Sequence, residues 1–282
     1  MSAYEDRPVA SLPRLELPAR RVDRAGTTLS AAAAAWFTVA ALGQWLFVVY
    51  IAGFYGRSLL AGRMRDWNQV LPEGHTPGDT LGNLMVMLHI LLALVVTAAG
   101  TLQLVPAIRR RWPRFHRWNG RIYLATVVAV VLAGLYMVLA RDGGLRVMQF
   151  GILLNAAVVL GCAAMALRHA LARRIDRHRR WALRLFVAAS GVWFFRIGLT
   201  FWLLVNQGPV GFDPETFTGP FLVFLSFAQT LLPLAILELY LRARDSGGPA
   251  ARWTVAALLA LATGVTATGI FAASLILWLP RL

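Results

Sequence analysis

Two segments of the chain carry nearly the same set of chemically capable side chains. Residues 114–121 read Arg-Phe-His-Arg-Trp-Asn-Gly-Arg, and residues 176–184 read Asp-Arg-His-Arg-Arg-Trp-Ala-Leu-Arg. Each segment places a histidine beside an arginine at the point where a long apolar run begins. Histidine changes its charge near neutral pH, and arginine presents several N–H groups to an anion. The repetition predicts a site at these two matched junctions.

The chemistry that these residue types suggest most directly is haem ligation. His116 and His178 are expected at equal depth and would face each other across one iron, as in proteins that hold haem b between two helices. Arginines would meet the haem propionates, so Arg117, Arg179 and Trp181 complete the predicted cofactor-binding set. One observation opposes this hypothesis, because His116 precedes its predicted membrane span, whereas haem ligands of helical bundles normally lie within helices.

A second set of polar side chains lies inside the apolar runs. At 1.5 Å per residue, His89, Asn155 and Arg196 are expected about 12 Å below the outer surface, with Gln44 close to that depth and Gln229 slightly deeper. A charged side chain in hydrocarbon requires a partner, and no carboxylate is expected at this depth. The sequence predicts a ligand site made of His89, Asn155, Arg196 and Gln229. The alternative is that these side chains satisfy one another and hold the helices together.

Glu238 is the only acidic residue within a predicted span. An ion pair with Arg184 or Arg121 would tie the sixth span to the fifth or the third. Because paired charges are common near the ends of spans, we expect a structural ion pair, with Arg184 as its other member. The single cysteine, Cys162, excludes an intrachain disulfide and a multi-cysteine metal centre. No metal site is predicted.

Composition assigns these motifs to a membrane protein. Hydrophobic residues make up 58% of the 282 and charged residues only 15%, far from the balance of a soluble domain. A span needs about 20 apolar residues. We therefore predict an all-α, polytopic protein with about seven transmembrane helices near residues 31–54, 81–105, 120–140, 147–167, 181–205, 218–240 and 253–279.

Arginine sets the expected orientation, because short loops rich in basic residues remain in the cytoplasm. All 28 basic residues are arginine, and most fall in the even-numbered connections and the N-terminal segment. The N-terminus is therefore predicted to be cytoplasmic and the C-terminus outside, in a multi-pass inner-membrane protein. Topology and anionic lipid account for the net charge of +15, so nucleic acid is not an expected partner.

The domain organisation is simple. Residues 1–30 are polar, contain proline and are predicted to form a disordered cytoplasmic tail. Residues 31–282 are predicted to form one transmembrane helical domain. Small residues in the last span, Ala260, Gly264 and Gly269, form a surface that would suit a homo-oligomer or a neighbouring helix of the same bundle.

The ordered motifs also resemble a known family. His89, residues 100–106, residues 113–123, residues 178–184 and Arg196 occur in the order found in the predicted membrane proteins catalogued as domain of unknown function 2306. The resemblance covers residues 82–240 and includes Glu238. Ala182 and the Leu232-Pro233 pair depart from the family pattern. The resemblance implies a bacterial polytopic membrane protein and supplies no activity.

Three classes of function remain open. The first is a redox component associated with haem or quinone, and the second is a carrier or binding protein for a small anionic or hydrophobic molecule. The third is a non-catalytic assembly scaffold whose arginine-rich loops bind partners or membrane lipid. The sequence has no phosphate-binding loop, HExxH motif or nucleophile elbow, so no catalytic residue is identified and enzymatic activity is left open.

Overall fold

The described part of the chain is built from helices. A computed structural model describes residues 23–71, 73–141 and 147–282. The α-helices are α1 (Arg24–Tyr50), α2 (Arg57–Leu60), α3 (Thr80–Leu104), α4 (Pro106–Arg111), α5 (Pro113–Tyr136), α6 (Val147–Leu171), α7 (Ile175–Ala189), α8 (Gly191–Asn206), α9 (Pro220–Ser246) and α10 (Pro249–Ala273). Short π and 3₁₀ turns are η1 (Ile51–Gly56), η2 (Met64–Gln69), η3 (Met137–Arg141), η4 (Ser274–Trp278) and η5 (Leu279–Arg281).

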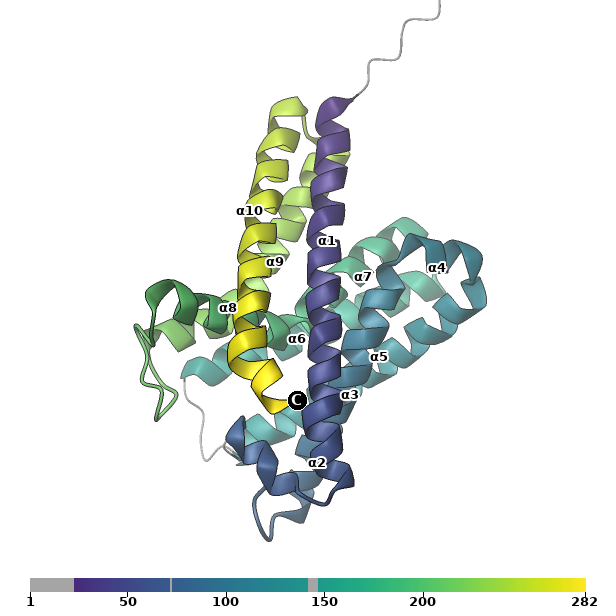
Figure 1. The fold of residues 1–282 in the computed structure, drawn as a ribbon. Coiled ribbons are helices and arrows are strands. Elements are labelled where there is room, and N and C mark those ends of the chain that lie inside the picture. Colours follow the sequence, from purple (N-terminus) through teal and green to yellow (C-terminus); the bar gives the residue numbers. More distant parts are fainter. Residues whose placement is uncertain (1–22, 72, 142–146) are drawn as a thin grey trace, which may run out of the picture.

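The number of spans agrees with the sequence prediction. Six helices are long and apolar enough to cross a membrane, and the bent pair α7 and α8 makes up to seven. In Figure 1, α1, α9 and α10 stand side by side, while α3 to α7 form a second group that leans away from them. Arg57, beyond the end of α1, donates a hydrogen bond to the carbonyl oxygen of Leu282, so the start of α1 and residue 282 lie at opposite ends of the bundle. Which end is cytoplasmic remains a prediction from arginine distribution.

The first helix begins earlier than expected. The predicted disordered tail extended to residue 30, but α1 starts at Arg24, and only residues 1–22 of that tail lie outside the described part. The Asp23 carboxylate caps the helix by accepting a hydrogen bond from the Gly26 backbone N–H at 2.9 Å. Leu29 is 1% exposed and packs with residues of α9 and α10. Burial and capping therefore override the polar character of this stretch.

The predicted fifth span is two helices. α7 ends at Ala189, α8 begins at Gly191, and their axes differ by 49°. The break falls at Ser190, whose hydroxyl donates to the Phe186 carbonyl of the preceding turn. A serine bonded to its own helix and followed by glycine is a common cause of a helix kink. The span predicted over residues 181–205 therefore falls across two helices, the bent pair that makes the seventh candidate span.

Polar side chains from three other helices stabilise this break. Gln44 of α1 donates to the Ser190 hydroxyl at 2.9 Å. Asn155 of α6 donates to the Ala188 carbonyl at 2.9 Å and to the Thr230 hydroxyl of α9 at 2.8 Å. In a bilayer, backbone groups freed by a kink must be satisfied by protein, because no water is available. The bond from Asn155 satisfies the Ala188 carbonyl at the break, and the bonds of Gln44 and Thr230 hold Ser190 and Asn155 in place.

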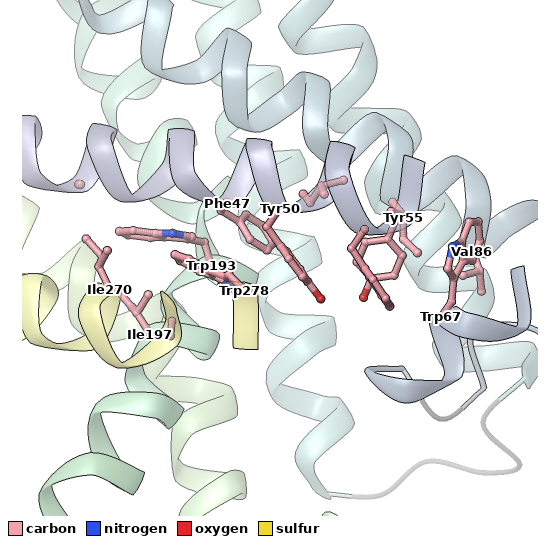
Figure 2. Packing of buried hydrophobic residues seen from close by; sticks show 14 residues of the cluster. Phe47, Tyr50, Tyr55, Trp67, Val86, Trp193, Ile197, Ile270 and Trp278 are labelled. Carbon is pink, nitrogen blue, oxygen red and sulfur yellow. The ribbon is translucent and has the colours of Figure 1, made fainter. Parts of the chain in front are cut away.

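An aromatic cluster packs around the last turns of α1 and includes Trp193 of α8, just after the break. Figure 2 shows Phe47 and Tyr50 of α1 beside Trp278, with Tyr55 and Trp67 farther along. Ring centroids are 5.6 Å apart for Phe47 and Trp278, and 5.8 Å apart for Tyr55 and Trp67. Aromatic pairs at this spacing add to the free energy gained from burial. The cluster joins α1, η2 and η4 into one unit.

The hydrogen bonds at the break predict a measurable loss of stability. Thr230→Val keeps the shape of the side chain but removes the acceptor for one Asn155 N–H in a fully buried site. A lost partner in the interior costs about 1–3 kcal/mol, so thermal unfolding of the detergent-solubilised protein should begin at a lower temperature. Thr126→Val is the control, because the Thr126 hydroxyl bonds only to carbonyls of its own helix. Equal effects of the two substitutions would contradict this role of Thr230.

Candidate functional site

The two histidine motifs occupy equivalent positions in two helices. His116 is the fourth residue of α5, which begins at Pro113, and His178 is the fourth residue of α7, which begins at Ile175. Proline suits the first turn of a helix, because its missing N–H has no partner there in any case. His116 precedes the span predicted over residues 120–140 but lies within a helix, because α5 starts seven residues before that span.

Both motifs face one large cavity. Its volume is about 1400 Å³, and it lies where α3 to α7 meet α1, α8, α9 and α10. The polar end is lined by side chains from four elements. These are Gln103 of α3, Arg109 of α4, His116 and Arg117 of α5, and Asp176, His178 and Arg179 of α7. The sequence predicted the four histidine and arginine residues of the two motifs here, and the structure places all four on the same cavity.

The rest of the cavity is apolar. Its wall includes Trp36 and Phe37 of α1 and many aliphatic and aromatic side chains of α8, α9 and α10. Phe224, Leu232 and Leu261 line it and are 63%, 58% and 66% exposed, so part of the wall opens sideways where lipid would surround the bundle. The arrangement is a basic end joined to a long apolar space.

The positive charge at the polar end is only partly neutralised. Within the residues that the structure describes, no carboxylate lies within 4.0 Å of Arg109, Arg117 or Arg179. Asp176 is the one acidic side chain among the lining residues there. The cavity therefore offers a net positive, hydrogen-bond-donating surface to whatever enters.

The histidines leave nitrogen atoms available. His178 Nδ1 lies 2.9 Å from the Ala166 carbonyl oxygen of α6, which leaves Nε2 as the second ring nitrogen. His116 Nδ1 is buried and has no hydrogen-bond partner in the described part of the chain. The two rings are close enough to interact electrostatically. These imidazoles can accept or donate hydrogen bonds to a polar group in the cavity.

Each motif also holds a tryptophan against an arginine. The Arg121 guanidinium lies 4.9 Å from the ring centroid of Trp118, and that of Arg184 lies 4.8 Å from the ring centroid of Trp181. Such contacts place a cation on the negative face of an indole ring. Neither tryptophan lines the cavity. Trp181, which was predicted to bind a cofactor, contacts Arg184 instead.

Carboxylates of α9 hold α7 in place. Arg184 forms a bidentate ion pair with Glu238, with Nε–Oε1 at 2.6 Å and Nη2–Oε2 at 2.9 Å. This is the pair that the sequence suggested. Arg180 makes a second ion pair with Asp245, which also binds Arg244. Both carboxylates of α9 are thus already paired, Glu238 with Arg184 and Asp245 with Arg180 and with Arg244, which itself lines the cavity.

The predicted intramembrane ligand site is divided between different surroundings. Asn155 braces the helix break, as described above, and Gln229 donates to the Ser226 carbonyl of its own helix at 2.9 Å and lines the apolar wall. His89 Nδ1 lies 3.0 Å from the Val130 carbonyl oxygen of α5. Arg196 lies over the ring of Phe47 at 5.3 Å. Of these four residues, only Gln229 lines the cavity described above.

His89 and Arg196 nevertheless remain neighbours. Arg196 interacts electrostatically with His89 and with Tyr50 of the aromatic cluster. No carboxylate within 4.0 Å pairs with Arg196 in the described residues. The ring of Phe47 and the Val192 carbonyl, 3.4 Å from Nη1, are its contacts instead.

Sequence reasoning missed several residues near the polar end. Gln103, Arg109 and Asp176 line the cavity but were not selected. His169 of α6 is 5% exposed, has an unpartnered Nδ1 within the described residues and interacts electrostatically with His178. For Gln103 and Arg109, the signal in the sequence was their position just before the first histidine motif.

Metal-ligating side chains are sparse. The described residues contain no group of three or more His, Cys, Asp or Glu side chains that could hold a metal ion. Cys162 is buried in α6 among apolar side chains.

The Arg184–Glu238 pair predicts an energetic coupling between α7 and α9. In a double-mutant cycle with Arg184→Gln and Glu238→Gln, we expect a coupling free energy of about 1 kcal/mol, kept small by the partial exposure of both side chains (20% and 35%). Unfolding in detergent would measure it. Glu215→Gln, in the exposed loop before α9, serves as a charge-matched control. A coupling of zero would show that the ion pair does not hold the helices together.

Comparison with known proteins supports the family and no activity. Residues 86–215 match the model of the family described as Predicted membrane protein (DUF2306). The matched segment is somewhat less than half of the chain; it agrees with the resemblance that the motifs indicated and ends before Glu238. Neither a curated protein nor a solved structure matches the chain.

Proposed function

We propose that this membrane protein binds or carries an amphipathic molecule with an anionic head group and an apolar body. One observation carries the proposal: a single cavity joins the two histidine–arginine motifs to a long apolar space. Binding sites for small molecules are typically concave and mostly apolar, with a few placed polar groups that orient the ligand. This is the second of the three functional classes considered from the sequence, but with the binding site at the histidine motifs instead of the intramembrane site predicted there.

The polar end favours an anion over a cation. Arg109, Arg117 and Arg179 lack a carboxylate partner within 4.0 Å in the described residues. If an uncharged apolar molecule covered part of this surface, the guanidinium groups would lose hydration without gaining a partner, which costs free energy. An anionic head group would form charge-assisted hydrogen bonds there. The arginines that hold α7 to α9 are already paired and would not compete for it.

The size and opening of the apolar end favour a lipid-like body. At roughly 30 Å³ for a water-sized group, 1400 Å³ corresponds to on the order of 45 such groups, which exceeds a typical metabolite. The exposed apolar side chains along one wall would let a hydrocarbon chain enter from the bilayer. A molecule that partitions into membranes therefore fits better than a soluble anion.

Haem b is a second candidate occupant, and one observation favours it. His178 Nδ1 is held by the Ala166 carbonyl, as metal-bound histidines commonly are, and this leaves Nε2 for an iron. His116 lines the same cavity from another helix. Haem is itself amphipathic, and its propionates would meet Arg117 and Arg179.

Filling the cavity should abolish binding of the amphipathic ligand. Ala228 lies on the cavity wall in α9, and Ala228→Phe places a ring in the space that the chain would occupy. We expect the variant to lose the thermal stabilisation that an alkyl phosphate or alkyl carboxylate gives to the unmodified protein, and to lose co-purifying lipid detected by native mass spectrometry.

Ala157→Phe is the matched control, because Ala157 is exposed on α6 and does not line the cavity. If Ala228→Phe and Ala157→Phe bind the amphiphile equally, the cavity is not the binding site. If neither amphiphile stabilises the unmodified protein, while loop arginines remain essential in cells, the scaffold class is favoured instead.

An absorbance spectrum separates haem from the other ligands. If haem b is the occupant, protein expressed with added haem should show a Soret band that is lost in both His116→Ala and His178→Ala. His75→Ala, in the loop before α3, should leave that band unchanged. Absence of the band from the unmodified, folded protein would exclude haem and leave the amphiphile proposal intact.

A further inference from the structure

The two helix beginnings at the polar end have matching chemistry. Pro113 and Ile175, the first residues of α5 and α7, both line the cavity. The fourth and fifth residues of each helix are a histidine and an arginine, and all four of those side chains line it as well. α5 and α7 therefore present the same two residue types to the cavity, a histidine followed by an arginine.

We infer that these two pairs form a clamp for a phosphate head group, His116 and Arg117 binding it from α5 and His178 and Arg179 from α7. The inference rests on the proposed function and names the class of ligand. A tetrahedral phosphate presents three or more acceptor oxygens and can accept from both sides at once, whereas a planar carboxylate has two oxygens. A neutral quinone would leave the arginine charges without a counter-ion.

The charge balance supports a head group with two negative charges. Four arginines line the cavity: Arg244, which is paired with Asp245, and Arg109, Arg117 and Arg179, which contribute three positive charges against the one negative charge of Asp176. Glu238 is paired with Arg184, and Asp245 is shared by Arg180 and Arg244. A phosphate monoester, which carries nearly two negative charges above pH 7, would neutralise the remaining excess.

The helix beginnings add to this preference. The positive end of a helix dipole and the free N–H groups of a first turn both attract anions. Two helices begin at this cavity, and each is at least 15 residues long. Gln103 also lines the cavity, and the N–H groups of its amide can donate to a phosphate oxygen.

The test compares three amphiphiles with one alkyl chain and different head groups: phosphate, carboxylate and phosphocholine. Binding to the full-length protein in detergent would be measured by thermal stabilisation and by isothermal titration at pH 8. We expect the alkyl phosphate to bind about 10-fold or more tightly than the alkyl carboxylate, and the phosphocholine to bind weakest.

Matched arginine variants locate the clamp. Arg117→Ala and Arg179→Ala should each weaken alkyl phosphate binding by about 10-fold or more. Arg114→Ala and Arg177→Ala remove the same charge from the same two helices at positions that do not line the cavity, and should leave binding within about 2-fold. Equal losses in both sets would overturn the clamp, because only the overall charge would then matter.

The remaining outcomes separate this inference from the proposed function and identify the source of the phosphate. If carboxylate and phosphate bind equally and Ala228→Phe blocks both, the clamp is overturned and the proposed function stands. If Ala228→Phe affects neither, the proposed function fails as well. If inorganic phosphate alone stabilises the protein as much as the alkyl phosphate, and Arg117→Ala removes the effect, the clamp is supported with a soluble phosphate as its ligand.

Discussion

The break between α7 and α8 is the constraint on which the cavity depends. Its 49° bend turns α7 so that His178 and Arg179 line the polar end, while α8 continues along the apolar wall. A bend inside a membrane exposes backbone groups that lipid cannot satisfy. Asn155 satisfies the Ala188 carbonyl, while Gln44 and Thr230 bond to the Ser190 and Asn155 side chains, so polar residues from three helices stabilise the shape of the cavity.

Ion pairs determine which charges remain available for a ligand. In the described residues, Glu238 and Asp245 of α9 bind Arg184 and Arg180 of α7, while Arg117 and Arg179 have no carboxylate within 4.0 Å. Paired arginines hold helices together, and unpaired ones attract an anion. Both kinds occur within the same short motif, so residue type alone does not distinguish them. Position along the helix does distinguish them, because residues three or four apart share a face. Arg180 and Arg184 are four residues apart, and both pair with carboxylates of α9.

The sequence was less informative about the polar residues inside the spans. Depth along a helix axis can be counted at 1.5 Å per residue, and this placed His89, Asn155 and Arg196 in one layer. Depth does not reveal which way a side chain points around the axis. Asn155 turns toward the helix break, His89 toward α5 and Arg196 toward Phe47. The kink could not be located either, because Ser-Gly pairs occur in many straight helices.

What the sequence by itself determined is the class of the molecule: an all-α membrane protein of about seven spans, the family of its central segment, and two repeated motifs at helix ends. Those features follow from composition, length and local order. The ion pair of Glu238 with Arg184 was also expected from the sequence. Only the tertiary structure decided that the two histidine motifs line one cavity with a long apolar space, and that Gln103 and Arg109 line it as well. These contacts between helices depend on the tilt and rotation of each helix, which are set by packing against residues far away in the chain.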